Sequence, residues 1–168
     1  MTGKLTSVNI SLRKHVPKEP VAEAELRPGH GVVGDAHAGP GDRQVSLLGA
    51  ESIERQKQAL LAAANGRGVA SCPTAGPQLA PGAFAENLTV SGLEVWKLPV
   101  GTCLRVGREA VIEISRIGKE CHRGCAIYRR LGDCVMPREG VFARVIRGGL
   151  VRPDDEVRVE ERRDTDRE

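Results

Sequence analysis

The sequence predicts a mainly β protein, a barrel or a sandwich with one or two helices attached to it. Short segments rich in β-branched residues outnumber the segments with helix-forming composition, and Gly, Pro and Asp turns separate them. Strands and helices do not alternate along the chain, which argues against a parallel α/β sheet. Phe, Trp and Tyr make up only 2% of the residues, so we expect a core of Val, Leu, Ile and Ala.

The first part of the chain contains four segments that we interpret as strands and one that we interpret as a loop. Residues 5–12 (LTSVNISL) alternate partly between apolar and polar side chains, as a half-buried strand does. Residues 14–20 are basic and contain prolines, which predicts a loop, and residues 21–26 predict a short strand. Residues 44–48 (QVSLL) and 87–90 (NLTV) predict two further strands.

Residues 50–64 (AESIERQKQALLAAA) have the strongest helical composition in the chain. Ile53, Leu60 and Leu61 are spaced so that they could form one buried stripe on this helix. Residues 65–81 are rich in Gly, Ala and Pro, and we expect a long loop there.

The last part of the chain predicts further strands and one more helix. The expected strands are residues 95–98, 102–106 and 110–117, and residues 151–159 with a turn at 153–155 that leads into EVRV. Residues 121–130 tolerate a helix, whereas residues 142–146 are apolar and fit a strand or a helix. We expect a single domain over residues 1–160 and a charged, frayed tail over residues 161–168.

Composition excludes several classes of function. The formal net charge of +3 is too small to indicate a duplex-binding surface, and the few aromatic residues argue against a stacking platform for single strands. No apolar run approaches the roughly 20 residues of a membrane-spanning helix. The first residues lack the apolar stretch of a signal peptide, so we expect a cytoplasmic protein that binds neither nucleic acid nor membrane.

A glycine-rich stretch at residues 28–43 is the first candidate site. Its segment GHGVVG matches the G-x-G-x-x-G pattern of dinucleotide-binding loops, but the following DAHAGPGDR cannot open the helix that such a loop requires. The stretch also carries Asp35, His37, Asp42 and Arg43. These residues fit either turn chemistry or a polar pocket wall whose amides and guanidinium would suit a phosphate.

The cysteines form the second candidate site. There are five, at Cys72, Cys103, Cys121, Cys125 and Cys134. Cations surround the cluster that begins at Cys121, among them Arg116 and Lys119, and neighbouring cations lower the pKa of a thiol and increase its nucleophilicity and metal affinity. We therefore expect Cys121 to react fastest with an alkylating reagent and Cys103 to react slowest.

Three interpretations of this cluster stay open. The first is a reactive or metal-ligating thiol at Cys121. The second is a zinc or iron–sulfur module that uses Cys121, Cys125 and Cys134, with His122 or His37 as a fourth ligand of zinc. In the third, the cysteines are inert, small hydrophobic residues.

An ordered set of motifs resembles the MOSC domain, a family named for the C-terminal domain of molybdenum cofactor sulfurase. The motifs are Gly34-Asp35-x-His37, Arg43, PGAFAENLT at 81–89, Val100-Gly101-Thr102, the stretch 114–121 that ends at Cys121, and V-x-x-G-G-x-V-x-x-x-D at 145–155. The resemblance covers nearly the whole chain. It implies a strongly bent β-barrel of the pyruvate-kinase type and places Cys121 at the functional cysteine of the family.

The resemblance also implies a function. Cys121 would ligate molybdenum in the molybdenum cofactor (molybdopterin) or carry its sulfur as a persulfide; pyridoxal phosphate binding is implied at the family level only. The expected partner is a sulfur donor of the cysteine desulfurase type or a cofactor-biosynthesis protein. The pocket would be lined by residues 34–43, 81–87 and 119–121. The expected cofactor-binding residues are Gly34, Asp35, His37, Arg43, Asn87 and Lys119, with Arg43 and Lys119 on the phosphate and His37 and Asn87 on the polar edges of the pterin.

Overall fold

The structure is a computed structural model, and it describes residues 1–66, 79–120 and 134–161. Its strands are β1 (Thr2–Ile10), β2 (Glu19–Val21), β3 (Ala24–Arg27), β4 (Gly31–Val32), β5 (Val45–Gly49), β6 (Leu88–Ser91), β7 (Cys103–Val106), β8 (Ala110–Ile117), β9 (Val141–Arg147), β10 (Gly149–Val151) and β11 (Glu156–Glu160). Its helices are α1 (Ala50–Gly66), α3 (Met136–Glu139) and the 3-10 helix η1 (Val95–Lys97).

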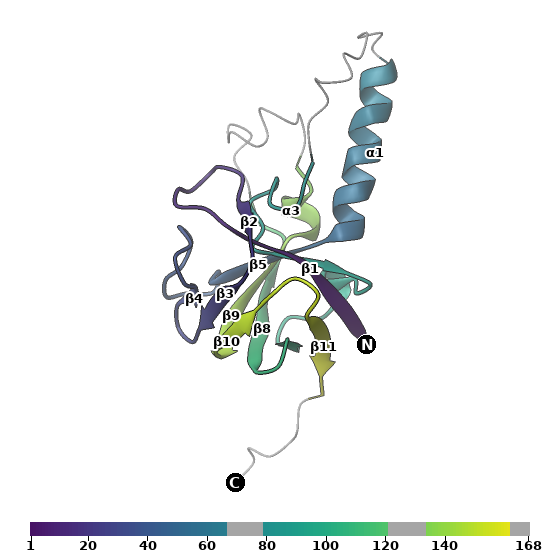
Figure 1. Cartoon of the computed structure of the whole chain (residues 1–168). Coiled ribbons are helices and arrows are strands. Elements are labelled where there is room, and N and C mark those ends of the chain that lie inside the picture. Colours follow the sequence, from purple (N-terminus) through teal and green to yellow (C-terminus); the bar gives the residue numbers. More distant parts are fainter. Residues whose placement is uncertain (67–78, 121–133, 162–168) are drawn as a thin grey trace.

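Seven strands close into a barrel (Figure 1), which confirms the predicted mainly β fold. Their order is β1-β6-β5-β9-β8-β7-β11, and β11 pairs back onto β1, where Gly3 lies opposite Val157. Strands β5 and β6 are parallel, and α1 lies within the connection between them, as a parallel pair requires. Closure leaves these strands without a free edge.

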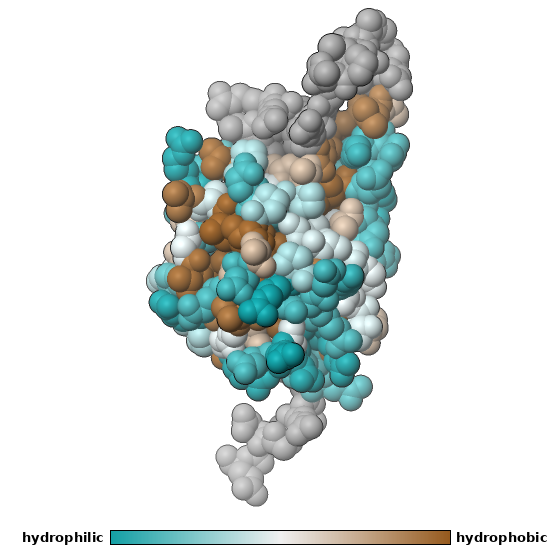
Figure 2. Space-filling model, viewed as in Figure 1, coloured by the Kyte–Doolittle hydropathy of each residue, from teal (hydrophilic) through white to brown (hydrophobic). Residues whose placement is uncertain are grey.

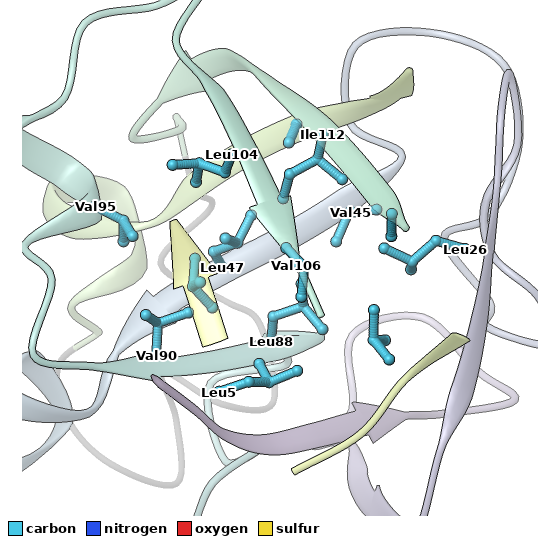
Figure 3. Packing of buried hydrophobic residues seen from close by; sticks show 14 of the residues in the cluster. Leu5, Leu26, Val45, Leu47, Leu88, Val90, Val95, Leu104, Val106 and Ile112 are labelled. Carbon is cyan, nitrogen blue, oxygen red and sulfur yellow. The ribbon is translucent and has the colours of Figure 1, made fainter. Parts of the chain in front are cut away.

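Aliphatic side chains fill the barrel, as the scarcity of aromatic residues predicts. Leu5, Leu47, Leu88 and Leu104 are completely buried and, in Figure 3, lie together between the surrounding strands. Strand β7 shows why: its residues alternate between half-buried and buried, so every second side chain faces the core. The barrel interior is therefore a packed core, and a ligand site has to lie outside it.

A second hydrophobic cluster covers the outer side of β5 and β9. Leu48 and Phe142 belong to this cluster, whereas their neighbours in β5 and β9 face the barrel core. Leu48 is completely buried, and Phe142 is nearly so. Phe84 and Met136 come from the turn before β6 and from α3. All five residues of β5 are buried for this reason, since the strand has a core on each of its faces. This second cluster supports one wall of the site described below.

A small sheet, with the order β10-β3-β4, holds the base of the glycine-rich stretch. Leu26 lies opposite both Gly149 and Val32, which joins β3 to its two neighbours. Gly31 has a positive φ of +111°, and a Cβ atom there would collide with the carbonyl group of Gln44. The chain therefore leaves this sheet at a fixed position before it enters the loop that carries Asp35 and His37.

Helix α1 starts directly after β5 and extends beyond the barrel (Figure 1). Ile53 is buried and Leu60 packs against the second cluster, as predicted, but Leu61 is 42% exposed. The predicted apolar stripe is therefore shorter than the helix, because the later turns extend past the surface against which they could pack. The outer edge of the helix is hydrophilic in the view of Figure 2.

Two expectations about local structure are corrected or completed. Residues 95–98 do not form the predicted strand but the 3-10 helix η1, in which Lys97 N–H donates to the Glu94 carbonyl at 3.0 Å. This tight turn buries Val95 in the barrel core within a few residues, which an extended strand would not do. The undecided segment 142–146 lies in strand β9.

Other expectations lie outside the described residues. These are the helix at 121–130, most of the loop at 65–81, and the tail beyond residue 161; residues 65 and 66 themselves belong to α1. Among the helices of the described part, none has the length and apolar character to cross a bilayer.

Candidate functional site

The glycine-rich loop is anchored by a buried ion pair between Asp35 and Lys18. The Lys18 ammonium donates to Oδ1 of Asp35 at 2.7 Å, and both side chains are completely buried. Two backbone N–H groups also donate to this carboxylate: the nitrogen of Ser11 lies 3.0 Å from Oδ1, and the nitrogen of His37 lies 3.0 Å from Oδ2. Asp35 thus fixes the loop end to β1 and to the segment before β2.

Burial alone would raise the pKa of Asp35, but the surrounding donors outweigh it. The hydrogen bond from Lys18, the N–H of Ser11 and the positive charge of Lys18 together hold the pKa of Asp35 below its ordinary value. Asp35 is therefore an ionised structural anchor at neutral pH.

His37 lies in front of this pair and is held by it. Its Nδ1 is 3.0 Å from Nζ of Lys18, and its side chain is 38% exposed. Burial and the charge of Lys18, opposed by Asp35 and reinforced by Lys119 and Lys14, lower the pKa of His37 to about 4. The ring is therefore neutral at physiological pH.

A pocket of about 470 Å³ opens beside His37, on the outer side of β5 and β9. It is lined by Lys14, His15, His37, Pro40, Gly41, Asp42, Arg43, Ser46, Ala85, Asn87, Lys119, Met136 and Phe142. Its volume falls within the range of small-molecule sites, which runs from about 300 to 1,000 Å³.

The charge and the walls of this pocket suit an organic anion. Lys14, Arg43 and Lys119 are cationic, whereas the one carboxylate among the lining residues, Asp42, lies 3.5 Å from Arg116. The Arg43 guanidinium lies over the ring of Phe142, 5.5 Å from its centroid. The pocket therefore combines a cationic rim with an apolar floor.

Asn87 contributes to the wall of the pocket, and three hydrogen bonds hold its side-chain amide in place. Its Oδ1 accepts from the N–H of Ser46 and from the Ser46 hydroxyl, both at 3.1 Å, and its Nδ2 donates to the Asn9 carbonyl at 3.1 Å. The side chain is buried, so it joins β1, β5 and β6 below the pocket.

The neighbouring Glu86 is completely buried and holds the turn that precedes β6. Its carboxylate accepts from the N–H of Gly82 at 2.6 Å, the N–H of Phe84 at 3.2 Å and the Thr89 hydroxyl at 3.1 Å. Burial raises the pKa of Glu86 in spite of these donors. The turn positions Ala85 and Asn87 at the pocket.

The structure brings four of the predicted site residues to one pocket and leaves Gly34 and Asp35 outside its lining. His37, Arg43, Asn87 and Lys119 line it. Asp35 lies behind it and acts on His37 and Lys18. Gly34 is exposed, with a positive φ of +85° and open space where a Cβ would lie. Cys121, the expected working thiol, lies outside the described residues.

Sequence reasoning missed Lys18, Met136 and Phe142. Lys18 belongs to a basic stretch that reads as a solvated loop, and nothing in its local sequence indicates complete burial. Phe142 belongs to the apolar segment whose type stayed undecided, and its place in β9 puts its ring on the outer side of the barrel. The scarcity of aromatic residues was the only signal that could have drawn attention to it.

The described cysteines are arranged differently from the expectation. Cys134 is 5% exposed and packs in the second hydrophobic cluster, whereas Cys103 is only half-buried. Cys134, not Cys103, is therefore the better protected of the two. Within residues 1–66, 79–120 and 134–161, no group of three or more His, Cys, Asp and Glu side chains is arranged to hold a metal ion.

The described residues thus form a small β-barrel domain with a cationic pocket on the outer side of the barrel. The family model of the MOSC domain matches residues 33–158, so the chain belongs to the MOSC domain family. This family is associated with proteins of the molybdenum cofactor sulfurase type. A search of curated protein sequences found no match.

Solved structures share the fold. The YuaD protein of Bacillus subtilis is 17% identical with a TM-score of 0.73, and the match covers 97% of this chain and 98% of that one. YiiM of Geobacillus stearothermophilus is 18% identical with a TM-score of 0.65, over 95% of this chain and 76% of that one. YiiM of Escherichia coli is 20% identical with a TM-score of 0.63, and the match covers 96% of this chain and 71% of that one.

Proposed function

We propose that the pocket binds the molybdenum cofactor and that Cys121 is its working thiol. The observation that supports this proposal is the convergence of Lys14, Arg43 and Lys119 on one pocket beside a neutral histidine. Cys121 follows Lys119 by two positions, so covalent geometry limits the separation of their Cα atoms to about 7 Å. Family membership supplies the same expectation independently.

The residues that line the pocket fit the parts of this cofactor. Arg43 and Lys119 would hold its phosphate, since guanidinium and ammonium groups commonly donate hydrogen bonds to phosphate oxygens. Phe142 and Met136 offer an apolar floor for a flat pterin ring, and His37 offers a polar contact at its edge. The amide of Asn87 is engaged by Ser46 and Asn9, so Asn87 would shape the wall rather than hold the pterin.

Cys121 would provide the sulfur ligand. A thiolate is a soft ligand and suits a molybdenum–sulfur centre, and nearby cations favour the thiolate over the thiol. When bound, the cofactor would supply redox chemistry at its metal. The residues of this chain would bind the cofactor, orient it, and keep the sulfur deprotonated.

The second candidate is a sulfur carrier that binds no molybdenum. A persulfide on Cys121 would be an anion, and the same cations, Lys14 and Lys119 among them, would stabilise it. The donor would be a protein of the cysteine desulfurase type: the Cys121 thiolate would take the outer sulfur of the donor's persulfide, and the donor cysteine would leave as a thiolate. Delivery of this sulfur as sulfide to a metal centre elsewhere would take two electrons from a thiol reductant. This candidate needs only the cationic rim and not the apolar floor of the pocket.

A zinc or iron–sulfur module built on Cys121, Cys125 and Cys134 is the third candidate and has less support. Cys134 is buried among Leu48, Phe84 and Met136. A ligand in that environment would place a metal ion in an apolar cluster, where its charge is poorly solvated.

Elemental analysis separates the three. The full chain is purified from a host that makes the molybdenum cofactor, and molybdenum, zinc, iron and released pterin are measured. We expect stoichiometric molybdenum and pterin, lost in Cys121→Ser and kept in the matched control Cys103→Ser. Absence of both under cofactor-replete conditions would overturn cofactor binding. A persulfide mass on Cys121 after treatment with a cysteine desulfurase would then identify the sulfur carrier, and stoichiometric zinc or iron the third candidate.

A further inference from the structure

The contact between Lys18 and His37 sets the state of the histidine in the pocket. Nζ of Lys18 has three hydrogen-bond donors and no acceptor when it is charged. Its partners are Oδ1 of Asp35 at 2.7 Å, Nδ1 of His37 at 3.0 Å and the hydroxyl of Ser11 at 3.3 Å. The three donors thus have three acceptors, and the ammonium is completely buried among them.

This arrangement leaves one tautomer for His37. Nδ1 has to accept from the Lys18 ammonium, so it carries no proton, and the proton of the neutral ring has to reside on Nε2. Protonation of Nδ1 would direct its N–H at a cation 3.0 Å away, and the carboxylate that could compensate lies farther off, with Oδ2 of Asp35 at 3.8 Å.

We propose that Lys18 is a positioning residue that holds His37 as a neutral Nε2–H donor, so that the pocket contacts an oxygen acceptor of its ligand at this ring. Within the described residues, Nδ1 is the ring nitrogen with a protein partner, and Nε2 makes no hydrogen bond. The ring is 38% exposed and lines the pocket, so Nε2–H is available to a ligand. Residues of the protein alone set this state of the ring, whichever ligand fills the pocket.

The same arrangement makes His37 a poor metal ligand. A metal-bound histidine usually donates its other N–H to a carboxylate or a carbonyl, which strengthens the ligating nitrogen. Here the other nitrogen accepts from a cation, which has the opposite effect, and Nε2 carries the proton. His37 is therefore not the fourth ligand of a zinc site that the sequence left open.

The other charged groups near the ring support this state. Lys14 and Lys119 face His37 from the segment before β2 and from the end of β8, and both oppose a positive charge on the ring. Asp35 alone favours a charge there, and its effect is smaller than that of burial and of Lys18. Removal of Lys18 together with Asp35 should therefore raise the pKa of His37 toward its ordinary value.

NMR of the full chain labelled with 15N-histidine tests the proposal. His37→Gln identifies the ring signals of His37 among those of the four histidines. In the native protein, long-range 1H–15N correlations should show a neutral Nε2–H ring throughout pH 5–8. A protonated ring at pH 6, or a proton on Nδ1, would overturn the proposal without any variant.

The role of Lys18 is tested in Lys18→Met combined with Asp35→Asn, which removes both charges so that neither is left buried alone. Its His37 should titrate at a higher pH than in the native protein and populate both tautomers. The matched control Lys14→Met removes an exposed cation of the same pocket and should leave the tautomer unchanged. An unchanged tautomer in the double variant would show that Lys18 does not set it.

A pterin with a phosphorylated side chain is the probe for the ligand, because its ring carbonyl offers an oxygen acceptor for His37 and its phosphate offers an anion for Arg43 and Lys119. Added to the native protein labelled uniformly with 15N, it should shift the His37 Nε2–H signal, and the shift should weaken in Arg43→Ala. Shifts at Arg43 and Lys119 without one at His37 would overturn the acceptor contact alone. No shift at any of the three would overturn the proposed cofactor site, whereas the tautomer would still be decided by the native spectrum.

Discussion

The backbone N–H of Lys18 donates a 2.8 Å hydrogen bond to the carbonyl oxygen of Gly82. This bond joins the segment before β2 to the turn that Glu86 holds, and a Cβ atom on Gly82 would collide with the Lys18 carbonyl. Two separate parts of the pocket region therefore meet at a glycine that has both a positive φ of +90° and no room for a side chain.

Gly82→Ala should be strongly destabilising. The alanine would have to adopt a left-handed conformation and displace the backbone at Lys18, which we expect to lower the free energy of unfolding by about 3 kcal/mol or more. Gly29→Ala is the matched control, since Gly29 has a φ of +67° but open space around its Cβ position; it should cost about 1–2 kcal/mol. Denaturant unfolding measures both, and equal effects would contradict the close contact.

Asp35→Asn should cost about 3–5 kcal/mol, because it leaves the buried Lys18 ammonium without a counter-charge. The exposed pair of Arg152 and Glu23, 2.7 Å apart, is the control, and Glu23→Gln should cost less than about 1 kcal/mol. Folding lowers the pKa of Asp35. Its contribution to the free energy of unfolding is therefore fully present at a pH above the ordinary pKa and is lost as the pH falls toward the lowered pKa. The difference in the free energy of unfolding between the native protein and Asp35→Asn should therefore be smaller at pH 3 than at pH 7.

Glu86 should make stability fall as the pH rises. Its pKa is raised, so between the ordinary value and the raised one the folded state keeps a proton that the unfolded state has lost. The free energy of unfolding should decrease across that window and level off above it. Glu86→Gln cannot titrate and should lack this decrease. Denaturant unfolding from pH 4 to pH 8 compares the two, and parallel curves would show that Glu86 does not change its charge there.

Arg43→Ala should weaken cofactor retention and leave the fold intact. Arg43 is exposed, and the contribution of its contact with Phe142 to stability is about 0.5–1 kcal/mol. Molybdenum and pterin that remain after gel filtration measure retention, and thermal unfolding measures the fold. Arg105→Ala removes a half-buried cation that pairs with Glu160 and does not belong to the pocket lining, so this variant should retain the cofactor. Loss of the fold in Arg43→Ala would make Arg43 a structural residue.

Alkylation at neutral pH should modify Cys121 first and Cys134 last. Cys121 follows Lys119 in a cation-rich segment, which favours the reactive thiolate, whereas Cys134 is buried among apolar side chains. Cys103, at intermediate exposure, should react between them. Peptide mapping after timed exposure to iodoacetamide gives the order, with the denatured chain as the control in which the differences disappear. Equal rates at Cys121 and Cys103 in the folded chain would contradict an activated thiol.

The sequence by itself determined the features that depend on local patterning. The mainly β class, the strand β8 at Ala110–Ile117 and the start of α1 at Ala50 follow from periods that neighbouring residues display. The ordered motifs around His37 and Asn87 indicated the MOSC family, whose model matches residues 33–158. Four of the residues that these motifs singled out line one pocket.

Only the tertiary structure decided how those residues are supported. The burial of Lys18 depends on Asp35, 17 positions away, and the barrel closes because β11 returns to β1 from the other end of the chain. The undecided segment around Phe142 became a strand because β8 and β5 flank it, and this placed its ring under Arg43. The burial of Lys18, the closure of the barrel and the position of the Phe142 ring depend on desolvation and on partners from distant segments of the chain. The local hydrophobic pattern of the sequence does not encode them.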